Sequence, residues 1–241
     1  TIEVLRKQGQ KLSLKRADRE ATEGVVIAKV SDDSTRGVVV KLSSETDFVA
    51  KNESFIDLTK EFADIALENF PATLEDLLAL PYKGGITIQD KVTEQVGVIG
   101  EKIELAEYAR LEAPLVTSYI HMGNKAAVLI GLNQANPDFI DAGRDVAMQV
   151  AAMKPLAVDK DGVDATIVEK EIEIGKEQAR QEGKPEEMLE KIALGKLSKF
   201  YKENTLLNQE FVKEAKTSVA QYLERIGKGL TVTEFKHIQL G

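Results

Sequence analysis

Two stretches of this sequence repeat one order of elements, and that order limits the folds available to the chain. In the first stretch, GVVIAKV (24–30) and GVVVKLS (37–43) flank the polar segment SDDSTR, whose composition is typical of a turn. In the second, LVTSYIHMG (115–123) and KAAVLIGLN (125–133) meet at Gly123–Asn124. Short β-branched and apolar runs on either side of a turn predict a β-hairpin in each stretch.

A predicted helix follows each hairpin. Residues 54–69 carry apolar side chains at helical spacing, and residues 139–153 begin with the same Phe-Ile-Asp triplet as the first helix. The shared order of elements, more than the shared triplet, leads us to infer a degenerate internal duplication of a hairpin–helix unit. Between the copies, a further helical pattern precedes 101–113, whose own apolar pattern fits either a strand or a helix.

Residues 163–204 differ from the rest of the chain in their dense charge. Their pattern predicts two helices joined at Gly183–Lys184–Pro185, because Gly is typical of helix ends and Pro of helix starts. We expect an antiparallel helical hairpin, which is either a purely structural element or an arm that contacts a partner or a second copy of the chain. A helix over 216–228 and a strand over 231–240 follow, and the strand most simply joins the sheet of the second copy.

These elements predict an α+β fold: two related subdomains of antiparallel β-sheet with packed helices, plus an inserted antiparallel helical hairpin. We expect a short helix and a basic linker first, then an N-terminal core subdomain, then a C-terminal core subdomain that the hairpin interrupts. The predicted bounds are 1–20 for the helix and linker, 21–113 for the N-terminal subdomain, 114–160 with 205–241 for the C-terminal subdomain, and 161–204 for the hairpin.

The composition argues against several classes of function. The 241 residues include no cysteine, so disulfides, thiol chemistry and cysteine-based metal sites are excluded, and a reducing, cytosol-like compartment fits. A formal net charge of -8 argues against a nucleic-acid-binding protein. Because no apolar run approaches the roughly 20 residues that span a bilayer, we expect no membrane partner.

The motifs of common active sites are also missing. The stretch Gly97–Lys102 lacks the spacing of a phosphate-binding P-loop, so we expect no direct nucleotide binding, and the signatures of hydrolases, zinc proteases and dinucleotide-binding enzymes are absent. The only histidines, His121 and His237, lie in separate predicted strands, where a histidine is more often structural than catalytic. The sequence therefore predicts a binding protein rather than an enzyme, with no catalytic residue, no cofactor and no metal site.

The two copies differ in the connection between hairpin and helix. From Ser43 to Phe55 the chain is longer than from Asn133 to Phe139, by about the length of the segment TDFVAK. If the scaffold needs only the short connection, this inserted segment is not required for folding. Loops between strands and helices are a common place for functional residues.

The inserted segment allows two interpretations. Phe48 and Val49 either fold back over the end of the helix or protrude as an anchor for a partner protein, where burial of one such side chain contributes roughly 1.5–3 kcal/mol. Thr46 and Asp47 are residue types that favour turns and helix N-caps. Composition leaves both interpretations open.

The segment Lys41–Lys51, KLSSETDFVAK, resembles the signature of translation elongation factor Ts, and TDFVAKN is its most specific part. Four other segments resemble the same family in the same order: LRKQGQKLSLKRADREATEG (5–24), VAMQVAAMKP (146–155), GKPEEMLEKIALGKLSKFYKENTLLNQEFVK (183–213) and FKHIQLG (235–241). Lys41 and Ser43 depart from the family pattern. The resemblance also implies that most of the family's N-terminal helical domain is lacking, with residues 1–9 as its final helix.

The resemblance implies a guanine nucleotide exchange factor that binds elongation factor Tu and promotes GDP release in translation elongation. The implied partner-binding residues are Thr46, Asp47, Phe48 and Val49 in the inserted segment and His121, Met122 and Gly123 at the second hairpin. The helical hairpin, a short coiled coil, would support a homodimer or further partner contacts. The implied location is a bacterial cytoplasm or an organellar matrix. The alternative function is a ribosome-associated or structural interaction protein that uses the same exposed segment without exchanging nucleotide.

Overall fold

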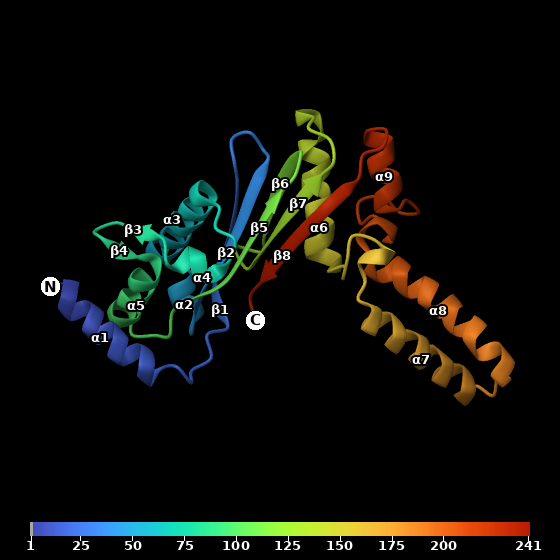
Figure 1. Cartoon of the computed structure of the whole chain (residues 1–241), viewed down its shortest axis with the longest axis horizontal. Helices are drawn as coiled ribbons and strands as arrows, with labels where there is room; N and C mark the ends of the chain where they lie inside the picture. The colour runs from blue at the N-terminus through green and yellow to red at the C-terminus, as the bar shows by residue number, and fades with distance from the viewer. Residues whose placement is uncertain (1) are drawn as a thin grey trace. The chain divides into compact units, whose positions relative to one another are not determined.

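The computed structural model describes residues 2–241 (Figure 1). The chain forms two compact units: one runs to Ala151 and includes Glu234–Gly241, and the other comprises Ala152–Thr233. Helices occur together with antiparallel sheets, which confirms the predicted α+β class. Within the described residues, none of the helices has the length and apolar character needed to cross a bilayer.

The first sheet has the order β1-β2-β5, with β2 in the middle. β1 (Glu23–Val30) and β2 (Arg36–Ser44) pair antiparallel and confirm the predicted first hairpin. β5 (Glu104–Glu112) pairs with the other edge of β2, so most of the ambiguous segment 101–113 is a strand. Pairing with β2 satisfies the backbone donors and acceptors along the edge that the two strands share, a benefit that the local sequence does not reveal.

Both faces of the first hairpin are buried, which explains its runs of consecutive valines. One face packs against α3 (Glu53–Asn69), which confirms the first predicted helix, and the other face packs against the second sheet. The core on the α3 side includes Val25, Ile27, Val38, Val40 and Leu42 of the hairpin with Phe55, Leu58 and Phe62 of the helix. The core between the sheets includes Val26, Ala28 and Val39 with Val116, Ala127 and Leu129.

The second sheet has the order β6-β7-β8. β6 (Leu115–His121) and β7 (Ala126–Leu132) confirm the second predicted hairpin, and β8 (Val232–Gln239) confirms that the last strand joins its sheet. α6 (Ile140–Met153) follows β7, as expected. Because the two sheets share a core, the predicted boundary at 113/114 falls inside one compact unit. The division into two core subdomains stays a prediction.

α1 (Ile2–Lys15) is longer than the helix expected over residues 1–9, and it packs against α5 (Ile88–Ile99). The backbones approach closely because Gly9 has no side chain: a Cβ atom there would lie 2.2 Å from the carbonyl oxygen of Thr93. The remaining short elements of this unit, apart from α2, are α4 (Leu74–Leu78), β3 (Pro81–Tyr82), β4 (Ile86–Thr87) and η1 (Pro137–Phe139).

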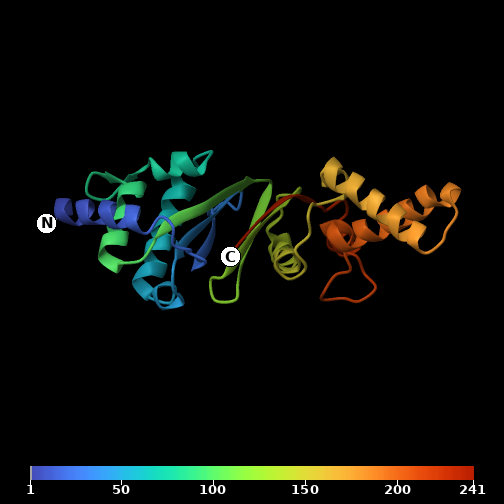
Figure 2. The same cartoon turned by 90° about the horizontal axis from the view of Figure 1, so that it is seen from below.

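The second unit contains the predicted helical hairpin. α7 (Ala165–Gln181) and α8 (Leu189–Asn204) lie side by side (Figures 1 and 2). Between them the chain reverses at Gly183, whose φ of 77° is in the left-handed region that favours glycine. α9 (Val219–Ile226) begins later than the helix predicted from residue 216, because Ser218 caps it in a capping box. The short elements of this unit are η2 (Lys160–Gly162), η3 (Glu186–Met188) and η4 (Leu206–Asn208).

Candidate functional site

The inserted segment that follows β2 is not simply a loop, because it contains a short helix that the sequence pattern did not predict. α2 (Asp47–Ala50) comes first, and α3 starts after its N-cap Asn52, whose side chain accepts a hydrogen bond from the Ser54 N–H at 3.0 Å. Thr46 is the N-cap residue of α2 and has an extended backbone. A single helical turn is too short to show a hydrophobic period, and the sequence therefore contains no signal for it.

Phe48 and Val49 lie in opposite environments. The Phe48 side chain is 83% exposed, whereas Val49 packs against the core beneath α3 and Ala50 is buried. The interpretation in which both residues fold back therefore holds for Val49 and fails for Phe48. An aromatic side chain in water has apolar area that a partner can bury, and aromatic residues are enriched among those that dominate binding energies at interfaces.

Asp47 presents a carboxylate beside Phe48. Its side chain is half exposed, and its Oδ2 atom lies 3.1 Å from Nζ of Lys51, one helical turn later. The hydrogen bond from Lys51 lowers the pKa of Asp47 below 3.8, and the positive charge of Lys51 acts in the same direction. Asp47 is therefore ionised at neutral pH, and it can accept hydrogen bonds from a partner.

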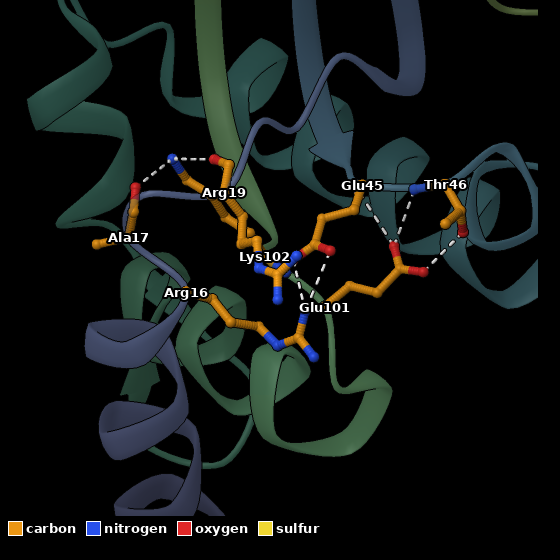
Figure 3. A network of polar contacts seen from close by, with 7 residues as sticks. All are labelled: Arg16, Ala17, Arg19, Glu45, Thr46, Glu101 and Lys102. Carbon is orange, nitrogen blue, oxygen red and sulfur yellow. Dashed lines mark hydrogen bonds and ion pairs between the residues drawn. The ribbon is translucent and has the colours of Figure 1, made fainter.

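Two carboxylates hold the start of α2, as Figure 3 shows. Oε2 of Glu101 accepts the backbone N–H groups of Glu45 at 3.0 Å and Thr46 at 3.1 Å. The Thr46 hydroxyl donates to Oε1 of Glu101 at 2.6 Å, so this side chain does not cap α2 itself. In return, Oε1 of Glu45 accepts the backbone N–H of Lys102 at 2.7 Å and pairs with Arg16 at 2.8 Å.

Sequence reasoning missed the roles of Glu45 and Glu101. Each carboxylate accepts backbone N–H groups of the other residue's segment, and these contacts depend on the pairing of β2 with β5, whose segment was ambiguous. The one local signal is Gly100, which ends α5 with a φ of 81°. A glycine there marks a change of chain direction directly before Glu101. The glycine does not indicate which residues hydrogen-bond to the Glu101 carboxylate.

The residues of the second predicted contact lie at the tip of the β6–β7 hairpin. Met122 is 67% exposed, and Met122, Gly123 and Asn124 all have positive φ angles, of 50°, 64° and 68°. Nδ1 of His121 lies 2.9 Å from the Tyr119 hydroxyl. The structure thus brings Thr46, Asp47 and Phe48 together at one short helix and places His121, Met122 and Gly123 at a separate hairpin tip.

Residues 2–241 contain no group of three or more His, Cys, Asp or Glu side chains that is arranged to hold a metal ion. The polar groups around α2 hydrogen-bond to one another, and Phe48 and Asp47 face outward. This arrangement is suited to contact with another protein.

Comparison with known proteins decides the family. The family model described as "Elongation factor TS" matches residues 45–241. Elongation factor Ts of Christiangramia forsetii is 52% identical over 240 residues, which cover 100% of this chain and 86% of that protein. The proteins of the same name from Amoebophilus asiaticus and Porphyromonas gingivalis are 50% and 47% identical and cover 100% and 99% of this chain, and 87% and 86% of their own lengths. The chain belongs to the elongation factor Ts family.

Membership of the elongation factor Ts family confirms the resemblance seen in the sequence and assigns the chain to translation elongation. It also makes the atypical Lys41 of β2 informative. The Lys41 side chain is only 8% exposed, and its Nζ lies 3.1 Å from Oε1 of Glu107 and 3.2 Å from the carbonyl oxygen of Gln239. A basic residue is tolerated at this buried position because both acceptors stabilise its charge.

Proposed function

We propose that this chain binds elongation factor Tu in the cytoplasm and promotes the release of its GDP, without itself being an enzyme in the usual sense. Family membership supports this role. The observation that carries it is the position of Phe48, which is 83% exposed although the next residues, Val49 and Ala50, are packed into the core. The ring is therefore available to a partner while its backbone is anchored.

In the proposed mechanism, Phe48 inserts between elements of the partner's GTPase domain and shifts the groups that hold GDP. By linkage, the factor weakens GDP binding by the same ratio by which GDP weakens binding of the factor. Burial of one such ring contributes roughly 1.5–3 kcal/mol, which corresponds to a change of about 10- to 150-fold in affinity. The ionised Asp47 adds a hydrogen bond to a helix N-terminus or a basic group of the partner.

A second contact supplies the remaining binding energy in this proposal. His121, Met122 and Gly123 form it, because Met122 exposes a flexible apolar side chain at the hairpin tip. Contact at both places lets the factor hold the partner while Phe48 acts on the nucleotide site.

Stopped-flow release of fluorescent GDP from elongation factor Tu tests the proposal. We expect the chain to accelerate release, and Phe48→Ala to reduce the maximal rate at saturating factor by at least about tenfold, since the lost ring contributes roughly 1.5 kcal/mol or more. Leu156→Ala is a matched control, because Leu156 is also exposed but lies in the other compact unit. If saturating wild-type chain binds elongation factor Tu without accelerating release, the chain is an interaction protein of another kind.

We also propose that the helical hairpin is a separate interaction surface, which forms a homodimer. Ile167 and Ile174 are two turns apart on α7 and both remain exposed. A second copy of the hairpin would cover these apolar side chains. Sedimentation equilibrium checks this proposal: the wild-type chain should associate, and Ile174→Glu should shift it to monomer.

A further inference from the structure

The segments 45–46 and 101–102 hold each other through backbone and side-chain groups in both directions. The pairing of β2 with β5 ends at Ser43 and Glu104. Beyond that point the Glu101 carboxylate accepts two backbone N–H groups from the first segment, and the Glu45 carboxylate accepts one from the second. We call this arrangement the Glu45–Glu101 clasp (Figure 3).

The clasp is attached on its other side to the chain that follows α1. Arg16 donates to both carboxylate oxygens of Glu45, at 2.8 and 3.1 Å. Nζ of Lys102 donates to the carbonyl oxygens of Ala17 at 3.1 Å and Arg19 at 3.2 Å. Burial raises the pKa of Glu45, but the hydrogen bonds from Lys102 and Arg16 outweigh it, and the pKa lies below its usual value. The clasp therefore contains two carboxylates, each of which accepts hydrogen bonds from several donors.

The clasp acts at Thr46, the residue of the candidate site that directly precedes α2. α2 has a single turn, and a helix of that length is not stable on its own, so its direction depends on the groups that hold its ends. Val49 and Ala50 hold one side through the core. Glu101 holds Thr46, the N-cap residue, through both its N–H and its hydroxyl.

We infer that Glu101 is a positioning residue that fixes the direction of α2 and so presents Phe48 and Asp47 in the orientation that binds the partner. This inference rests on the proposed function. Glu101 does not itself need to touch elongation factor Tu. Its effect is to keep the binding-competent orientation of α2 almost fully populated in the free protein.

This role predicts a specific kinetic signature. If only a fraction of the molecules has the competent orientation, the apparent dissociation constant rises by the inverse of that fraction, while the bound complex is unchanged. Loss of Glu101 therefore raises the concentration of factor needed for half-maximal GDP release and leaves the maximal rate nearly unchanged. Loss of Phe48 lowers the maximal rate instead.

The experiment compares Glu101→Ala, Glu101→Gln and the control Glu112→Ala in the GDP release assay, over a range of factor concentrations. Glu112→Ala likewise removes a carboxylate that accepts a hydrogen bond, in this case from Arg36, but Glu112 lies at the far end of β5. For Glu101→Ala we expect the half-saturating concentration to rise about tenfold. Glu101→Gln should stay within about threefold of wild type, because the amide oxygen still accepts the backbone N–H groups and the amide nitrogen can donate to Thr46.

Hydrogen exchange of the free protein tests the clasp independently of nucleotide exchange. We expect the amides of Glu45 and Thr46 to exchange about tenfold faster in Glu101→Ala, and near the wild-type rate in Glu101→Gln. If the wild-type chain fails to accelerate GDP release, the proposed function fails, and amide exchange still reports whether the clasp exists.

The following results of the release assay and of amide exchange would overturn the inference. They are an unchanged half-saturating concentration in Glu101→Ala, an equal loss in Glu101→Gln, which would indicate a direct charge contact with the partner, or unchanged exchange of the Glu45 and Thr46 amides. A reduced melting temperature that accounts for the whole loss of activity would also contradict it.

Discussion

At the scale of single residues, the neighbours Phe48 and Val49 have different roles: Phe48 is exposed to a partner, and Val49 anchors the short helix to the core. Both are large apolar residues in a polar stretch, yet one is in water and the other contacts the core. In one helical turn, successive side chains point about 100° apart. A short helix therefore gives two adjacent residues two environments, so that the anchoring side chain and the exposed side chain can be altered independently.

The first prediction concerns this separation. Val49→Ala should lower the free energy of unfolding by about 1 kcal/mol, because it removes methyl groups that pack against the core. Phe48→Ala should change that free energy by less than about 0.5 kcal/mol, since its side chain is already exposed. Urea unfolding followed by circular dichroism checks both values. A larger destabilisation by Phe48→Ala would mean that the ring is packed in solution.

The second prediction concerns the ionisation of Asp47. Its pKa is lowered in the folded chain, chiefly by the hydrogen bond from Lys51. A lowered folded-state pKa means that the interaction stabilises the protein above the unfolded-state pKa and that this stabilisation is lost as the pH falls through the folded-state value. We expect Lys51→Gln to return the pKa of Asp47 toward 3.8, as measured by a carboxyl-detected NMR titration. An unchanged pKa in this variant would remove Lys51 as the cause.

At the scale of elements, the structure uses glycines where helices approach other backbones. The contact of α1 with α5 depends on Gly9, where any Cβ atom would collide with the carbonyl oxygen of Thr93. By contrast, Gly195 lies within α8 and has open space around the position of a Cβ atom. The same residue type is therefore required at one helix and dispensable at the other.

The third prediction follows from this contrast. Gly9→Ala should lower stability by about 1–3 kcal/mol, as expected for overpacking, and should release α1 from α5. Gly195→Ala is the matched control and should stabilise α8 by about 0.5–1 kcal/mol, because alanine favours helices. Amide exchange within α1 and α8, residue by residue, reports both effects. Wild-type protection of α1 in Gly9→Ala would show that the close approach of α1 to α5 does not require glycine.

At the scale of the whole molecule, the two sheets share one core while the helical hairpin belongs to the other unit. Val26 and Val39 of the first sheet and Leu129 of the second are all fully or almost fully buried in that shared core. A shared core couples the unfolding of the two hairpins, whatever their origin by duplication. The hairpin of α7 and α8 has its own buried contacts.

The fourth prediction is that Leu129→Ala destabilises both sheets together by about 2–5 kcal/mol, as is typical of a cavity in a core. Hydrogen exchange measured by mass spectrometry should show equal loss of protection in β1 and in β7. Peptides from α7 and α8 should keep their wild-type protection. Loss of protection in β7 alone would mean that the sheets are separate folding units.

Much of the fold was predictable because it depends on local patterns. The two hairpins, α3, α6 and the pair α7–α8 were all found from apolar periodicity and from turn residues such as Gly183, which act within a few residues of the chain. The ambiguous segment 101–113 needed a neighbouring strand to decide it. α2 was missed, since its one turn is held by Glu101, which is distant in sequence.

The sequence by itself determined the class of fold, the family and the identity of the inserted segment, because these depend on residue order and short-range preference. Only the tertiary structure decided that Phe48 is in water, that Val49 is packed, and that the start of α2 is held by Glu45 and Glu101. The physical reason is that exposure and long-range hydrogen bonds depend on which distant segments meet. That meeting follows from strand pairing and core packing, which no short stretch of sequence contains.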